Sequence, residues 1–221
     1  MLAEDPCVGV DLPPLQRREM EALSVDECER FLAVARESKW FALFALALTS
    51  GMRPSEFLAL KWTDIEWQRG TASIRRTIQV SPSGWQFYDT KRKRSRRIVK
   101  LQGFVLNALD NLRNGQLQAK EGDPEGVHDL LFRSSSGMRL KQRTVKREFR
   151  RLLAAAGVRA IRLYSLRHTA ATLAAAAGVS VKVISNQLGH ASILFTLERY
   201  THVLPCIQDE AAARVERMLT G

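Results

Sequence analysis

Apolar residues recur along most of the chain at the spacing of amphipathic helices. A capping box formed by Ser24 and Glu27 predicts that a helix begins there. Residues 40–50 are apolar almost throughout, which predicts a buried helix, and Gly51 is the residue type that commonly ends one. Pro54 suits the first turn of the helix that follows.

The middle of the chain has the period of β-strands instead. Residues 71–80 (TASIRRTIQV) alternate and are rich in β-branched side chains, and the turn residues SPSG follow them. Residues 85–90 (WQFYDT) and 96–101 (RRIVKL) predict two more strands, with the basic tip KRKRS between them. We therefore expect one small antiparallel sheet that includes a basic hairpin.

The second half of the chain returns to helical spacing. The predicted helices cover residues 104–118, 140–156, 166–177, 180–188 and 193–199, and a last one runs from Pro205 to Leu219. The expected fold class is α+β, mainly α-helical, with a small antiparallel β-sheet.

The charge balance points to an anionic partner. The 221 residues include 34 Lys plus Arg against 23 Asp plus Glu, a formal net charge of +11. An excess of this size is most often matched to nucleic acid. A membrane surface is the alternative, but the sequence has no apolar run of the roughly 18 residues that a spanning helix needs.

Cysteine usage and the first residues bear on location and cofactors. The three cysteines are odd in number and widely spaced, so they predict neither a disulfide framework nor a metal site. The opening MLAEDPCVGVDLPP lacks the apolar stretch of a secretory signal. We expect a cytoplasmic protein that needs no metal and no cofactor.

Two motifs in the first half carry candidate chemistry. TSGMRPSE places Arg53 at a turn between helices, with Glu56 one turn later, and alone it is an ordinary helix start. DTKRKRSRRIVKL concentrates cations without an acid among them. Such a run is usually a solvated face, but on a hairpin it would form a compact arm able to reach DNA. Its expected DNA contacts are Arg92, Lys93, Arg94, Arg96 and Arg97.

Two more motifs follow in the second half. LYSLRHTAATL places Arg167 and His168 at the start of an apolar helix. NQLGHASILFTLERYTHV places His190 after a glycine and Tyr200 ten positions later. Taken singly, each is compatible with a packed helix end or a half-buried aromatic ring.

The order of the motifs is more specific than any one of them. G-x-R-x-x-E, T-K, L-R-H-T, L-G-H and a Tyr followed by T-H resemble the tyrosine recombinase (phage integrase) family over residues 24–203. The resemblance implies that Tyr200 cuts DNA and forms a 3′-phosphotyrosine intermediate. It also implies that Arg53, Arg167 and His190 bind the phosphate and that Lys91 is the general acid. Glu56 and His168 would support them.

One position departs from the family pattern. The family usually has His three residues before the second arginine, where this chain has Tyr164. A phenol, with a pKa of about 10, still donates a hydrogen bond to a phosphate oxygen, but it carries protons less well than imidazole at neutral pH. We expect Tyr164 to be a tolerated member of the catalytic set.

The resemblance also implies how the protein works as a whole. The expected function is site-specific recombination that integrates or excises a mobile element, on double-stranded DNA. A basic helix face would add DNA contacts, and weakening by salt is expected. The residues of that face are Lys141, Arg143, Lys146, Arg147 and Arg150.

The expected domain organisation is a linker at residues 1–20 and the catalytic domain at 21–221, without the family's N-terminal core-binding domain. Full-length members form homotetramers on paired sites by exchanging a C-terminal segment, here the one after Pro205, whereas the chain alone could be a monomer. Two alternatives stay open: a DNA-binding protein that has lost catalysis, and a type IB topoisomerase.

Overall fold

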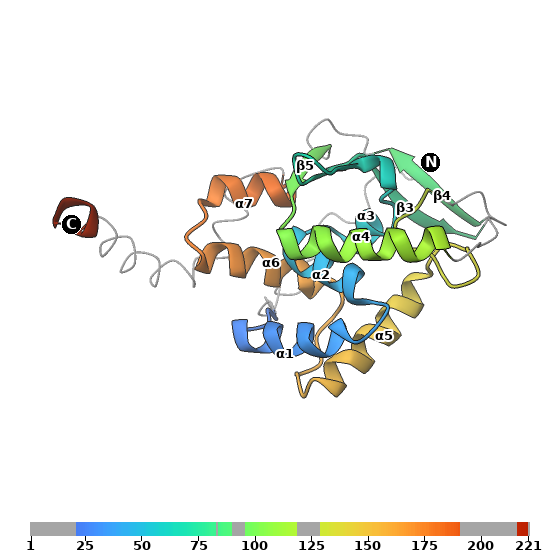
Figure 1. Ribbon diagram of the computed structural model, residues 1–221, viewed down its shortest axis with the longest axis horizontal. Helices are drawn as coiled ribbons and strands as arrows, with labels where there is room; N and C mark the ends of the chain where they lie inside the picture. The colour runs from blue at the N-terminus through green and yellow to red at the C-terminus, as the bar shows by residue number, and fades with distance from the viewer. Residues whose placement is uncertain (1–20, 83, 90–95, 119–128, 191–215, 221) are drawn as a thin grey trace, which may run out of the picture.

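The central helix of the structure is α2 (Phe41–Ser50), and its burial explains the unbroken apolar run in the sequence. Eight of its ten residues are buried. In the computed structural model it contacts α1 (Val25–Arg36), α4 (Gly103–Gln118) and α6 (Ser165–Ala176). Figure 1 shows α1 and α5 (Gln142–Ala155) on one side of α2, and α4 with the strands on the other.

The structure describes residues 21–82, 84–89, 96–118, 129–190 and 216–220. Within these ranges the chain is mainly helical with small antiparallel sheets, which confirms the expected fold class. None of the described helices is long and apolar enough to cross a membrane. The remaining elements are α3 (Pro54–Phe57), a 3-10 turn (Trp62–Asp64), β1 (Ile65–Glu66), β2 (Thr71–Ile74), β3 (Arg76–Ser81), β4 (Gly84–Asp89), β5 (Arg97–Lys100) and α7 (Val181–Leu188).

Helix ends lie close to where the local signals predict them. The Ser24 hydroxyl accepts a hydrogen bond from the backbone N–H of Glu27 at 3.2 Å, and the Glu27 carboxylate accepts one from the backbone N–H of Ser24 at 2.8 Å. Gly51 ends α2 with φ +66°, a left-handed conformation that glycine adopts without strain. A Cβ on Gly51 would lie 2.7 Å from Leu188 Cδ2, so this end of α2 packs closely against α7.

The strands form two sheets rather than one. Among the described strands, β2 pairs with β1 and β5, whereas β3 pairs with β4 in a second sheet. The expected strand over residues 71–80 is therefore wrong, because it is divided at Arg75 between the two sheets. The expected pairing of residues 85–90 with 96–101 is wrong for the same reason. Alternation indicates which face of a strand is buried, but it does not specify the neighbouring strand.

Three expected segments lie wholly or partly outside the described residues. The linker at residues 1–20 and the helix at 193–199 lie outside the described residues. Of the last predicted helix, residues 216–220 are described, and they are helical.

Three aromatic rings join the helices at the centre of the core. Phe31 of α1, Phe44 of α2 and Phe149 of α5 are all buried, and their ring centroids are 5.5–5.6 Å apart. Phe31 meets each of the other two rings edge to face, a favourable geometry for aromatic pairs. The cluster fixes α5 and α1 against the helix that leads to Arg53.

Replacing Phe149 by Ala is expected to lower the free energy of unfolding by about 3–5 kcal/mol, because it removes a buried ring and leaves a cavity. Urea denaturation measures the change. Phe104→Ala, at a ring that is 39% exposed, is the control and should cost under about 1 kcal/mol. Equal losses in the two variants would contradict the assignment of the core.

Candidate active site

The ends of three helices meet around the side chain of Arg167, which belongs to the first turn of α6. This side chain is among the largest that are fully buried, at 1% exposure. Its Nη1 donates to the carbonyl oxygen of Gly51 at 2.8 Å, and its Nη2 donates to that of Leu188 at 2.7 Å. Two of its five N–H groups are thus used to join α2, α6 and α7.

Glu56 holds Arg53 at the start of α3. One carboxylate oxygen accepts from the backbone N–H of Arg53 at 2.8 Å, and the other accepts from Arg53 Nη1, also at 2.8 Å. The Glu56 side chain is 1% exposed, whereas that of Arg53 is 36% exposed. The carboxylate is therefore internal, and the guanidinium that it orients faces the surface.

Arg97 occupies a different position from the one that the sequence suggests. The basic run groups it with DNA-facing cations, but in the structure its side chain is only 6% exposed. Its Nη1 and Nη2 donate to the two carboxylate oxygens of Glu56 at 3.0 and 2.7 Å, and its Nε donates to the carbonyl oxygen of Gln187 at 2.6 Å. Sequence reasoning missed this contact because the pair is 41 residues apart.

Arg53, Glu56, Arg97 and Arg167 form an arginine cluster, and opposing effects act on the pKa of its carboxylate. Burial raises the pKa of Glu56, but hydrogen bonds and the charges of Arg97 and Arg53 outweigh it and leave that pKa below its ordinary value. Burial, and next the charge of Arg53, lower the pKa of Arg167 to about 10. The cluster of Arg53, Arg97, Arg167 and Glu56 contains three guanidinium groups and one carboxylate, so formal positive charge is in excess.

The other predicted site residues lie around this cluster. Tyr164 directly precedes α6, is 46% exposed, and meets the ring of His168 edge to face at 5.4 Å. His190 is half-buried and follows Gly189, which ends α7 with φ +68°. Since Leu188 is bonded to Arg167, the L-G-H motif is attached to the arginine cluster.

Several predicted residues lie outside the described part of the chain: Lys91, Arg92, Lys93, Arg94 and Tyr200. Arg96 is described, and its exposed side chain is 3.2 Å from the Asp89 carboxylate. The described residues therefore bring together the two arginines, Glu56 and the L-G-H turn, but they do not reach the expected nucleophile or general acid.

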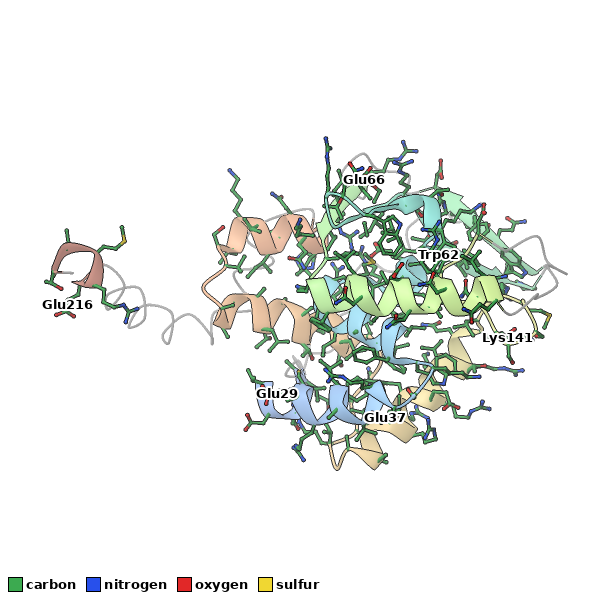
Figure 2. All side chains as sticks on the ribbon, in the orientation of Figure 1. Glu29, Glu37, Trp62, Glu66, Lys141 and Glu216 are labelled. Carbon is green, nitrogen blue, oxygen red and sulfur yellow. The ribbon has the colours of Figure 1, made fainter. Side chains whose placement is uncertain are left out.

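Helix α5 presents the second predicted group of cations. Lys141, labelled in Figure 2, precedes the helix. The face is less purely basic than the sequence suggests, because Glu148 lies 3.3 Å from Arg147 and 2.9 Å from Arg151. The hydrogen bond from Arg151 is the main reason that the pKa of Glu148 is lowered. The predicted contacts Lys141, Arg143, Lys146, Arg147 and Arg150 are all exposed.

A hollow of about 880 Å³ lies elsewhere, between the N-terminal end of α2 and helices α4 and α5. Trp40, Leu112 and Arg151 are among the residues that line it, and none of the arginine cluster does. Arg53 and Arg167 are instead at the C-terminal end of α2, where α2 meets α6. Among the described residues, no cluster of three or more His, Cys, Asp or Glu could hold a metal ion.

Comparisons with known proteins identify the family of the chain. The model of the phage integrase family matches residues 21–205. The chain is 30% identical to the tyrosine recombinase XerC-like protein of Caldanaerobacter subterraneus subsp. tengcongensis, over 92% of this chain and 57% of that protein. It is 23% identical to the ICEBs1 integrase of Bacillus subtilis, over 99% of this chain and 60% of that protein. The chain thus spans somewhat less than two thirds of these relatives.

Solved structures show the same fold. The crystal structure of the XerA recombinase matches with a TM-score of 0.70 and 26% identity, over 91% of this chain and 66% of that one. The Tn1549 transposon integrase in complex with a circular intermediate DNA matches with a TM-score of 0.76 and 21% identity, over 92% of this chain and 67% of that one. Because the family model covers most of the sequence, the chain belongs to the phage integrase family.

Proposed function

We propose that this chain is the catalytic domain of a tyrosine recombinase, which cuts and rejoins double-stranded DNA at specific sites to integrate or excise a mobile element. The observation that carries the proposal is the meeting of Arg53 and Arg167, from motifs more than a hundred residues apart, on one buried framework. The names of the relatives support the same class of reaction. The catalytic domain would extend over residues 21–221, after a linker at 1–20.

The two arginines would bind the phosphate that is attacked. A phosphodiester gains negative charge in its five-coordinate transition state, and planar guanidinium groups match its oxygens in pairs. Among the described residues, Gly51 and Leu188 account for two of the five N–H groups of Arg167. Arg53 keeps those not used by Glu56, on a side chain that is partly exposed. Loss of one such donor typically costs on the order of 10²–10³ in rate.

The covalent step is assigned to residues outside the described ranges. The Tyr200 oxygen would attack phosphorus and form a 3′-phosphotyrosine bond while the bond from phosphorus to the 5′-oxygen breaks. Lys91 would give its proton to that leaving oxygen, and His190 would donate a further hydrogen bond to the phosphate. A 5′-hydroxyl later reverses the step, so the bond energy is retained without ATP.

Tyr164 would donate a hydrogen bond to the same phosphate. Its exposed hydroxyl-bearing ring precedes Arg167 by one helical turn and rests against His168. DNA would be held by the cations of α5 and of the segment that includes Lys91, and a homotetramer would assemble on paired sites through the segment after Pro205.

Tyr200→Phe is expected to abolish a covalent protein–DNA adduct, because the variant lacks the attacking oxygen. The protein would be incubated with a pool of nicked duplexes of varied sequence, so that the cut piece diffuses away and the adduct accumulates. Denaturing gels detect the adduct, and mass spectrometry locates the modified residue. Tyr88→Phe is the control, since within the described residues the Tyr88 hydroxyl bonds the nearby side chain of Gln86. An adduct that survives in Tyr200→Phe would refute the assignment, and salt-sensitive binding without any adduct would favour a DNA-binding protein.

Tyr164→Phe is expected to slow adduct formation about 10- to 100-fold, the worth of one hydrogen bond to a charged group. Tyr164→His should keep the rate of the unmodified protein or exceed it, because imidazole restores a proton carrier at neutral pH. Single-turnover rates on saturating DNA separate this effect from binding. If Phe and Tyr give equal rates, the hydroxyl does not touch the phosphate.

DNA affinity is expected to fall steeply with salt, since binding to phosphates releases counterions. Replacing Arg143, Lys146 or Arg150 by Ala should reduce the slope of log K against log salt by about 1 for each phosphate that is no longer neutralised. Fluorescence anisotropy with a labelled duplex measures the slope. Lys39→Ala, an exposed cation at the other end of α2 from Arg53, should leave it unchanged. Equal slopes in all variants would remove α5 from the DNA interface.

A further inference from the structure

We propose that Arg97 is a positioning residue that holds Arg53 and Arg167 in one arrangement and keeps the Glu56 carboxylate from competing with DNA phosphate for Arg53. The inference rests on the proposed function. It differs from the role that the sequence suggests for Arg97, because the side chain is directed into the protein rather than toward a ligand.

The first support is that Arg97 connects the parts of the site that carry the two arginines. From β5 it forks onto both oxygens of Glu56, the group that also binds Arg53. Its Nε donates to the carbonyl oxygen of Gln187, and the next carbonyl along the chain, that of Leu188, accepts from Arg167. The guanidinium of Arg97 therefore bonds to Glu56, which holds Arg53, and to the residue beside Leu188, which holds Arg167.

The second support is the close approach of Arg97 to the L-G-H turn. A Cβ built on Gly189 would lie 3.1 Å from Arg97 Cδ and 3.2 Å from its Nη1. These distances are tighter than ordinary contacts, so the lack of a side chain at Gly189 gives Arg97 its room. The same glycine directly precedes His190, so Arg97 contacts the G-x-R-x-x-E motif through Glu56 and the L-G-H turn through Gly189.

The third support is the local charge. Arg53, Arg97 and Arg167 carry three positive charges and Glu56 one negative charge, which leaves a formal excess of +2. The Glu56 carboxylate is almost fully buried, so water screens its attraction for cations only weakly. Without Arg97, that carboxylate would draw the Arg53 guanidinium inward. With Arg97 in place, Arg53 can turn its remaining N–H groups toward an anion.

Arg97→Met and Arg97→Lys test the proposal. Single-turnover cleavage of nicked duplexes, at saturating protein, should slow on the order of 10²-fold in Arg97→Met, the cost of one misplaced phosphate donor. The cleavage rate of Arg97→Lys should lie between those of Arg97→Met and the unmodified protein, because lysine keeps the charge but not the paired N–H donors. The Kd for DNA should stay within about threefold, since binding depends on other cations.

Arg76→Met is the matched control. Arg76 lies 2.6 Å from the Asp64 carboxylate, with side chains 20% and 2% exposed, so it too forms a largely buried ion pair. Loss of either pair should lower the melting temperature. Only the Arg97 variant should lose cleavage, whereas Arg76→Met should cleave within about twofold of the unmodified protein.

A double variant keeps the test informative if Arg97→Met folds poorly. Arg97→Met combined with Glu56→Gln removes both buried charges, which is tolerated better than leaving one unpaired. It should cleave faster than Arg97→Met alone, because no carboxylate attracts Arg53. It should remain slower than the unmodified protein, because the Arg97 guanidinium that bonds both Glu56 and Gln187 is missing.

The outcomes separate this proposal from the one on which it rests. An unmodified protein that forms no adduct overturns both. If the unmodified protein forms the adduct, then cleavage by Arg97→Met at the unmodified rate overturns the positioning role alone. The positioning role is also overturned if Arg97→Met and Arg76→Met lose cleavage to the same extent. If Arg97→Met weakens the Kd for DNA and leaves the single-turnover cleavage rate unchanged, Arg97 is a DNA contact instead.

Discussion

The buried guanidinium of Arg167 is the constraint around which the rest of the site is arranged. A charge removed from water is costly unless its hydrogen bonds are replaced. Here two carbonyl groups replace them, those of Gly51 at the end of α2 and Leu188 at the end of α7. Helix C-termini carry partial negative charge and free carbonyls, so they suit a cation. Gly51 and Gly189 end these helices in the left-handed conformation, which leaves both carbonyls free to turn toward one side chain.

The features that could be predicted from the sequence are the ones with local causes. The capping residue Ser24 and the end of α2 at Gly51 depend on residues within one turn, and both lie where they are predicted. Arg97 could not be placed in this way, because a cation within a basic run has the same pattern whether it faces solvent or pairs with Glu56, 41 residues earlier. The partner of β2 was missed for a related reason, since period-two alternation is the same beside β4 as beside β5.

Part of the basic excess has an internal use. Arg76, Arg97 and Arg151 each lie within 3 Å of a carboxylate oxygen on the protein itself. The formal charge of +11 therefore describes the long-range attraction of the protein for polyanions, but it does not count the side chains that can contact phosphate. The exposed residues of α5 are better candidates for such contacts than the buried residues of β5. Burial thus separates Arg97 of β5, which holds Glu56, from the exposed cations of α5.

The arginine cluster also explains why a site of this kind needs a folded domain rather than a short motif. Its members come from α3, β5, α6 and the end of α7, and they share partners, since Glu56 binds both Arg53 and Arg97. Side chains that share a partner respond to substitution non-additively, because removing one changes what the others bind. Apolar residues in place of such buried charges often stabilise a protein. The cluster is therefore better understood as a preorganised anion site, whose cost in folding free energy is offset by the packing of α2, α1 and α5, than as a source of stability.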